Sequence, residues 1–124
     1  MPVTIDRNDP DELTTFSLSG KVKLPELVGA LERYGRSGPT RYELYDLGEL
    51  TGERLSSADI RSLIDFFRKY PNIRPPESKT AILVASDIDF GIGRMISILS
   101  DGQVPFKIEV FRSLDQALNW LRLE

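Results

Sequence analysis

Four stretches of the sequence repeat apolar residues at the i, i+3, i+4, i+7 spacing that gives a helix one apolar face. These sets are Leu24, Leu27, Val28 and Leu31; Ile60, Leu63, Ile64 and Phe67; Ile92, Met95, Ile96 and Leu99; and Leu114, Ala117, Leu118 and Leu121. Runs suited to strands occupy residues 3–6, 13–18, 41–47, 80–86 and 107–111. The resulting order, ββαβαβαβα, predicts an α/β fold with a mixed, mostly parallel five-stranded sheet and four helices.

The run at residues 80–86 differs from the other expected strands because its central part, "AILVA", is apolar at every position. Continuous apolar sequence is typical of a strand that is covered on both faces. We therefore expect this run to be the central strand. The turn-forming residues 8–12, "NDPDE", predict an antiparallel hairpin between the first two strands. Gly35 is expected to end the first helix in a left-handed conformation.

The composition is that of an ordinary globular domain, and we expect residues 1–124 to form a single one. The hydrophobic content is 40% and the net charge is −3. Without a basic excess, binding to nucleic acid is not expected. The longest apolar run, residues 81–85, is too short to cross a bilayer, and the polar first ten residues contain no apolar signal core. We therefore expect a soluble, cytoplasmic, bacterial-type protein with no integral membrane association.

The chain contains no cysteine and no histidine. These absences exclude thiol nucleophiles, thiolate metal sites and the commonest general base. We expect no metal and no cofactor, and the protein is predicted not to be an enzyme. The remaining catalytic alternative is a carboxylate pair formed by Asp46 and Asp87, which follow two strands expected to be neighbours. Aspartates in such positions also commonly cap turns and helices.

Several segments together resemble the SpoIIAA-like branch of the STAS fold. They are "YDLGEL" at residues 45–50, "SSADI" at 56–60, "FGIGRM" at 90–95 and "VFRSLDQALNWL" at 110–121. STAS relatives include anti-sigma-factor antagonists, domains of anion transporters and lipid-binding neighbours of similar fold. The resemblance implies a function in binding and regulation, not in catalysis.

The resemblance also draws attention to Ser56 and Ser57. Anti-sigma-factor antagonists carry an Asp-Ser-Ser-Gly motif with a phosphorylatable serine at a helix start, where this chain has Leu55-Ser56-Ser57-Ala58. Phosphorylation of Ser56 or Ser57 is one interpretation. The other is that Ser56 is the N-cap of the helix, with Asp59 completing a capping-box-like arrangement.

The segment "DIDFGIGRM", residues 87–95, contains two glycines where a strand is expected to give way to a helix. Gly91 and Gly93 could let an anionic group approach free backbone N–H groups, with Arg94 adding positive charge. Neither a dinucleotide fingerprint nor a P-loop is present, because the third glycine and the Gly-Lys-Ser/Thr ending are missing. Alternatively, the glycines only permit a tight connection between strand and helix.

We predict a non-enzymatic regulatory or protein-binding module whose contact surface lies at strand exits and helix starts. The residues assigned to this surface are Asp46, Ser56, Ser57, Asp87, Phe90, Gly91 and Arg94. A protein partner is the first expectation, and the surface could also join two copies in a homodimer. An alternative is a small apolar or lipid-like ligand between helices and sheet, its polar head meeting Arg94 or a helix N-terminus. An enzyme with a carboxylate pair ranks last.

Overall fold

The computed structural model describes residues 2–69 and 74–122. The elements follow the predicted order and are β1 (Val3–Asn8), β2 (Leu13–Gly20), α1 (Leu24–Arg36), β3 (Tyr42–Leu50), α2 (Ser57–Lys69), β4 (Lys79–Leu83), α3 (Asp87–Ser100), β5 (Lys107–Phe111) and α4 (Leu114–Arg122). The predicted α/β fold class is therefore confirmed.

All five strands form one sheet in the order β1-β2-β3-β4-β5. The β1–β2 pair is antiparallel, as the hairpin prediction required, and the other three pairs are parallel. The expectation that residues 80–86 form the central strand is wrong. The central strand is β3, and β4 lies next to the edge and ends at Leu83. Its apolar sequence reflects helices packed on both of its faces, which does not require a central position.

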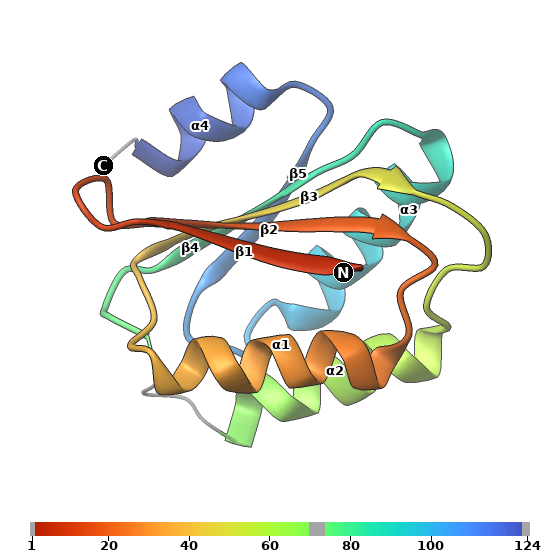
Figure 1. The fold of residues 1–124 in the computed structure, drawn as a ribbon, viewed down its shortest axis with the longest axis horizontal. Coiled ribbons are helices and arrows are strands. Elements are labelled where there is room, and N and C mark those ends of the chain that lie inside the picture. The colour runs from red at the N-terminus through yellow and green to blue at the C-terminus, as the bar shows by residue number, and fades with distance from the viewer. Residues whose placement is uncertain (1, 70–73, 123–124) are drawn as a thin grey trace.

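Helices cover both faces of the sheet unequally, and Figure 1 shows α1 and α2 together on one side and α4 alone on the other. Phe16, Tyr45, Ile82 and Val110 occupy matching positions on four neighbouring strands, so their side chains share one face. This is the face of α1, α2 and α3, because Phe16 packs with residues of α1 and Val110 meets α3 at Gly93.

The opposite face of the sheet is covered by α4. Leu44 and Ala81 point to this side and form a buried cluster with Ala117 and Leu121 of that helix. The α4 stripe expected from the sequence is thus buried at Ala117 and Leu121, whereas Leu114 is exposed.

The predicted stripe of α3 is only partly correct. Ile92, Met95, Ile96 and Leu99 are half-buried, whereas the buried residues of α3 are Asp89, Gly93 and Ser100. Small and polar side chains therefore face the sheet, and α3 lies close to it.

Two expectations for glycines are also wrong. Gly35 lies inside α1, and the positive φ after this helix belongs to Gly38, at +90°. Gly91 and Gly93 lie within α3, not at the connection from β4, because the helix already begins at Asp87. A Cβ on Gly93 would lie 2.6 Å from Val110 Cγ2, so this glycine permits the close approach of α3 to β5.

Candidate functional site

The carboxyl ends of β3, β4 and β5 meet at one edge of the sheet, which we call the rim. An ion pair ties the loop after β3 to the first turn of α3 at this rim. Arg54 Nε lies 2.7 Å from Asp89 Oδ1, and Arg54 Nη2 lies 3.2 Å from Asp89 Oδ2. Arg54 Nη1 also donates to the Gly52 carbonyl at 2.6 Å. The hydrogen bond to the Asp89 carboxylate raises the pKa of Arg54, and the contact connects the loop before α2 to the first turn of α3.

A second ion pair ties the exit of β5 to the same turn of α3. Arg112 Nη2 lies 2.7 Å from Asp87 Oδ1. The Arg112 guanidinium also stacks over the Phe90 ring, with Cζ 4.5 Å from the ring centroid, as a cation–π contact. The structure thus brings together two residues of the predicted surface, Asp87 and Phe90, through a residue that the sequence analysis missed.

Ser56 and Ser57 are both exposed at the start of α2. The Ser56 hydroxyl accepts a hydrogen bond from the Asp59 backbone N–H at 3.1 Å, and the Asp59 carboxylate accepts one from the Ser56 N–H at 3.2 Å. This reciprocal pair is the capping-box-like arrangement predicted from the sequence. The cap occupies the Ser56 hydroxyl, and Ser57 is the first residue of the helix.

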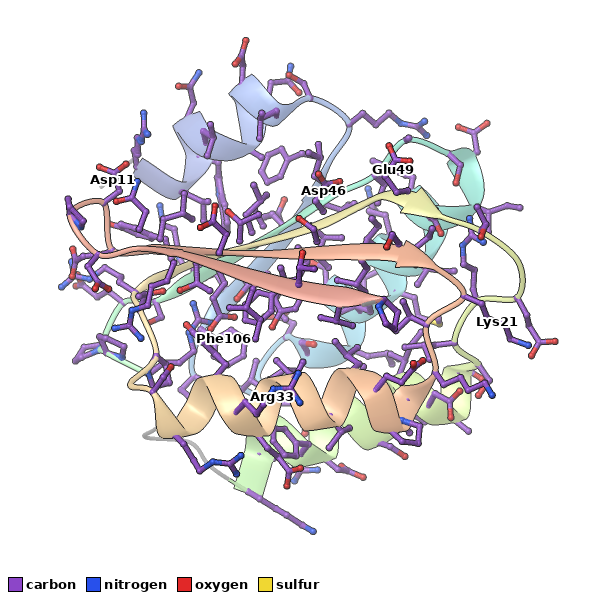
Figure 2. All side chains as sticks on the ribbon, in the orientation of Figure 1. Asp11, Lys21, Arg33, Asp46, Glu49 and Phe106 are labelled. Atoms are coloured by element: carbon purple, nitrogen blue, oxygen red, sulfur yellow. The ribbon has the colours of Figure 1, made fainter. Side chains whose placement is uncertain are left out.

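Asp46 lies apart from the other predicted surface residues. Its carboxylate accepts a hydrogen bond from the Gly48 backbone N–H at 2.9 Å, which is the turn-capping role considered for it. Figure 2 shows Asp46 on the side of the sheet that α4 covers, whereas α2 and α3 lie on the other side. Asp46 and Asp87 each have a different partner, so the geometry gives no support to the catalytic carboxylate pair.

The first turn of α3 is unsuited to an anion. It carries two carboxylates, Asp87 and Asp89, and the Asp89 N–H already donates to the Ser86 hydroxyl at 3.1 Å. Gly91 is exposed in the second turn, and Arg94 is exposed one turn further along.

Apolar residues occupy the solvent side of α3. Ile88 and Ile98 are 69% and 64% exposed, and they are two of the four large exposed hydrophobic residues in the described chain. At 100° per residue, the positions of Ile88, Gly91, Met95 and Ile98 fall within roughly 80° of the helix circumference. We call these four residues the α3 face. Arg94 borders it.

A buried ion pair lies beneath this helix layer, and the sequence analysis did not single it out. Arg74 Nε lies 3.1 Å from Glu43 Oε2, and the two side chains are 5% and 4% exposed. Arg74 also donates to Thr80 Oγ1 at 2.6 Å and to the carbonyls of Arg41 and Lys79 at 2.9 Å. These bonds hold the Arg74 guanidinium beside Glu43. Glu43 lies in the core, on the face of the sheet opposite Asp46.

The pKa values of two tyrosines near this buried ion pair are raised. Burial, reinforced by the Glu43 charge, raises the pKa of Tyr34 to about 12. The same causes raise the pKa of Tyr45 well above its ordinary value. The Tyr34 hydroxyl accepts from the Thr40 N–H at 2.8 Å, so the neutral tyrosine is part of a closed hydrogen-bond network.

A cavity of about 120 Å³ lies between the sheet and α1, α2 and α3. Its lining is mostly apolar and includes Leu27, Leu63, Ile82, Ile92, Ile96 and Ile108. The polar residues on the lining include Glu43, Arg54, Asp89 and Ser100. Arg94, which was expected to meet the head of a lipid-like ligand, is not among the lining residues.

Within residues 2–69 and 74–122, no three acidic side chains come together in a cluster that could hold a metal ion. In the same residues, each helix is too short or too polar to span a bilayer.

Two solved structures share this architecture. One is an uncharacterized protein of the DUF3478 family with a SpoIIAA-like fold from Shewanella loihica PV-4. It matches 96% of this chain and 91% of its own, with a TM-score of 0.61 and 21% identity. The chain has a SpoIIAA-like fold. The second structure is an anti-sigma factor antagonist from Mycobacterium paratuberculosis, with a TM-score of 0.64, 18% identity and coverage of 98% of this chain and 93% of that one.

The SpoIIAA-like fold predicted from the sequence is thereby confirmed by structural similarity. No protein-family model and no curated protein matches the sequence. At these levels of identity, the similarity describes the arrangement of the chain, and function has to be argued from the residues.

The sequence of this SpoIIAA-like chain located the start of α2 but placed the start of α3 too late, and it gave no signal for Arg54, Arg112 and Arg74. Each lies in a connection between elements, where periodicity carries no information. Glu43 had a usable signal, because the alternation of "RYELYDL" places it on the same face as Tyr45 and Leu47.

Proposed function

We propose that the protein is a non-enzymatic regulatory module of the cytoplasm that binds a partner protein through the α3 face and the adjoining rim. The contact surface is proposed to include Ser56, Ser57, Asp87, Phe90, Gly91 and Arg94 from the sequence-based assignment, together with Ile88 and Ile98. Asp46 is left out because it lies on the other face of the sheet.

The single observation that carries this proposal is the exposure of Ile88 and Ile98 on one side of α3. Exposed apolar residues that gather on one helix face are a common mark of a protein contact. The other long helices present charge to solvent instead, for example Glu32 and Arg33 on α1 and Asp65 and Arg68 on α2. Arg94 beside the α3 face favours a partner that places an acidic residue next to its apolar contact.

The start of α2 is a suitable place for regulation of that contact. Arg54 connects this start to Asp89 of α3, and the two exposed serines follow within three residues. Ser57 is the better candidate for phosphorylation because the Ser56 hydroxyl is engaged as the cap. A phosphate on Ser57 would suit the positive end of the helix dipole and would add negative charge beside the partner surface.

Two further observations support a binding role. The chain lacks histidine and cysteine, and the carboxylates of Asp46 and Asp87 are engaged by Gly48 and Arg112. The structural neighbour from Mycobacterium paratuberculosis is described as an anti-sigma factor antagonist.

Photo-crosslinking in the native host tests the proposal. A benzoylphenylalanine replaces Ile98 in one version of the protein and Leu114 in a control version, since Leu114 is also a large exposed apolar residue but lies on α4. We expect one defined partner protein to be crosslinked from position 98 and not from position 114. The additional substitution Ile88→Asp should abolish that crosslink, because it introduces a charge on the α3 face. The helix itself should tolerate the change, since aspartate is favourable in the first turn of a helix.

Two results would contradict the proposal. Equal crosslinking from positions 98 and 114 would show that the α3 face is not specific. If the only crosslinks join two copies of the chain, the α3 face forms a homodimer contact and not a contact with a partner protein.

A further inference from the structure

The fully buried apolar residues on the side of α1, α2 and α3 form two clusters, and half-buried Leu47 packs against both. One contains Phe16, Leu18, Leu27 and Leu63, and the other contains Ile82, Val84 and Ile108. A domain of this size usually has a single contiguous core on a covered sheet face. The cavity lies between the clusters, since its lining draws Leu18, Leu27 and Leu63 from the first and Ile82 and Ile108 from the second.

The volume of the cavity is sufficient for a small organic molecule. At about 120 Å³ it approaches the size of an engineered apolar cavity, roughly 150 Å³, that binds benzene. Its lining includes Asp89 in the first turn of α3 and Ser100 at the end of that helix. These two residues are roughly 16 Å apart along the helix axis, so the lined space runs along α3 and favours a chain-like molecule over a compact one.

Ser100 provides a specific polar contact in this space. The residue lines the cavity and is 3% exposed, and its hydroxyl has no hydrogen-bond partner among the described residues. Leaving a buried hydroxyl unpaired is costly, and most buried polar groups in proteins are paired. Other hydroxyls nearby in the fold are engaged: Ser97 donates to the Ile108 carbonyl at 2.8 Å, and Thr80 Oγ1 accepts from Arg74 at 2.6 Å.

The charges around the cavity favour an uncharged molecule. Among the described lining residues, the one cationic side chain is Arg54, and it is already paired with Asp89. Three acidic residues line the same space, Glu43, Glu53 and Asp89, and Glu43 is paired with Arg74. A carboxylate or phosphate would therefore find no free cation and would meet a lining with an excess of negative charge.

We propose that the cavity is a binding site for a short, neutral aliphatic molecule that ends in a hydroxyl or carbonyl group, and that Ser100 hydrogen-bonds this group. The aliphatic part lies against the apolar residues of α1, α2 and the sheet. This site is separate from the α3 face, which is on the solvent side of the helix.

Binding can be measured by following backbone amide chemical shifts in a titration with 1-hexanol, and with hexanoate as the charged analogue. We expect 1-hexanol to give saturable shifts at lining residues such as Leu63, Ile82 and Ser100. Hexanoate should bind at least about tenfold more weakly, because its charge has no partner in the cavity.

The substitution Ser100→Ala should weaken 1-hexanol binding by about threefold to tenfold through loss of one hydrogen bond. The matched control is Ser62→Ala, since Ser62 is also a helical serine but is exposed on α2 and does not line the cavity. It should bind 1-hexanol like the unmodified protein. A second variant, Ile96→Phe, should reduce the space and weaken binding.

Three outcomes would overturn the proposal. They are the absence of saturable shifts with 1-hexanol up to its solubility limit, equal affinity for hexanoate, and unchanged affinity in Ser100→Ala. None of these outcomes depends on the partner protein. The cavity proposal can therefore be disproved while the proposed contact at the α3 face stands, and that contact can be disproved while the cavity proposal stands.

Discussion

Arg74 and Glu43 form an ion pair in the core of the protein, with Nε and Oε2 3.1 Å apart and both side chains at least nine-tenths buried. The two partners do not depend on each other equally. Arg74 has three further hydrogen bonds and stacks on Phe106, with Cζ 4.4 Å from the ring centroid. Among the described residues, the hydrogen bonds that Glu43 accepts from Tyr45 and Thr80 are long, at 3.3 and 3.4 Å.

This asymmetry predicts that Arg74→Met destabilises the protein more than Glu43→Gln does. Removing the arginine leaves a buried carboxylate nearly unpaired, which costs about 3–5 kcal/mol. The glutamine variant should lose less, because the guanidinium keeps its other acceptors. Urea unfolding gives both free energies. Arg68→Met is the control, since its ion pair with Asp65 is exposed and should change the stability by less than about 0.5 kcal/mol. Equal losses in the two core variants would contradict this account.

The close approach of α3 to β5 predicts opposite effects of alanine at two neighbouring glycines. Gly93→Ala places a Cβ 2.6 Å from Val110 Cγ2 and should cost about 1–3 kcal/mol. Gly91→Ala meets open space and should stabilise the helix by about 0.5–1 kcal/mol. Thermal or urea unfolding measures both. Adding Val110→Ala should recover part of the loss from Gly93→Ala, and a purely additive double variant would contradict the steric cause.

The raised pKa of Tyr34 predicts a loss of stability at high pH. Burial keeps this tyrosine protonated in the native state up to about pH 12, whereas in the unfolded chain it ionises near pH 10. The stabilising contribution is therefore complete below about pH 10 and is lost as the pH rises toward 12. At pH 11 the loss for this group should be about 1.4 kcal/mol relative to pH 8.

The measurement compares the free energy of unfolding of the unmodified protein with that of Tyr34→Phe at both pH values. Lysines and the other tyrosines titrate in both proteins, so their effects cancel in the difference. The advantage of the unmodified protein should shrink between pH 8 and pH 11. An unchanged difference would show that Tyr34 titrates in the native state as it does in the unfolded chain.

The two adjacent serines at the start of α2 are predicted to differ in their contribution to stability. Ser56→Ala removes the acceptor for the Asp59 N–H and should cost about 1 kcal/mol. Ser57→Ala, at an exposed position within the first turn, should stay within about 0.5 kcal/mol of the unmodified protein. Ser56→Asp should restore most of the loss, because aspartate is also a good N-cap. If the two alanine variants unfold at the same urea concentration, the cap assignment is wrong.

The predictions made from the sequence were correct where a regular pattern extends over several residues. The alternating order of helices and strands was correct because apolar spacing reflects which side of an element is covered, and the covered side is a local property. The predicted position of β4 in the sheet was wrong because a local property does not report the order of the strands. "AILVA" records that both faces are covered, and it carries no information on how many strands lie to either side.

The candidate site could be predicted only in part. Ser56 as a cap and Asp46 in a turn involve partners two or three residues away, so the sequence contains both members of each interaction. The partners of Asp87 and Asp89 are 25 and 35 positions distant, at Arg112 and Arg54. No local pattern relates such residues, and only the folded chain shows which charges meet.

By itself, the sequence determined the fold class, the succession of elements and the absence of imidazole and thiol chemistry, because composition and periodicity are properties of the chain before it folds. The tertiary structure decided which side of α3 faces solvent, that Glu43 is buried against Arg74, and that a cavity separates two parts of the core. These features depend on contacts between elements distant in sequence, and Gly93 against Val110 is the contact that brings α3 close to β5.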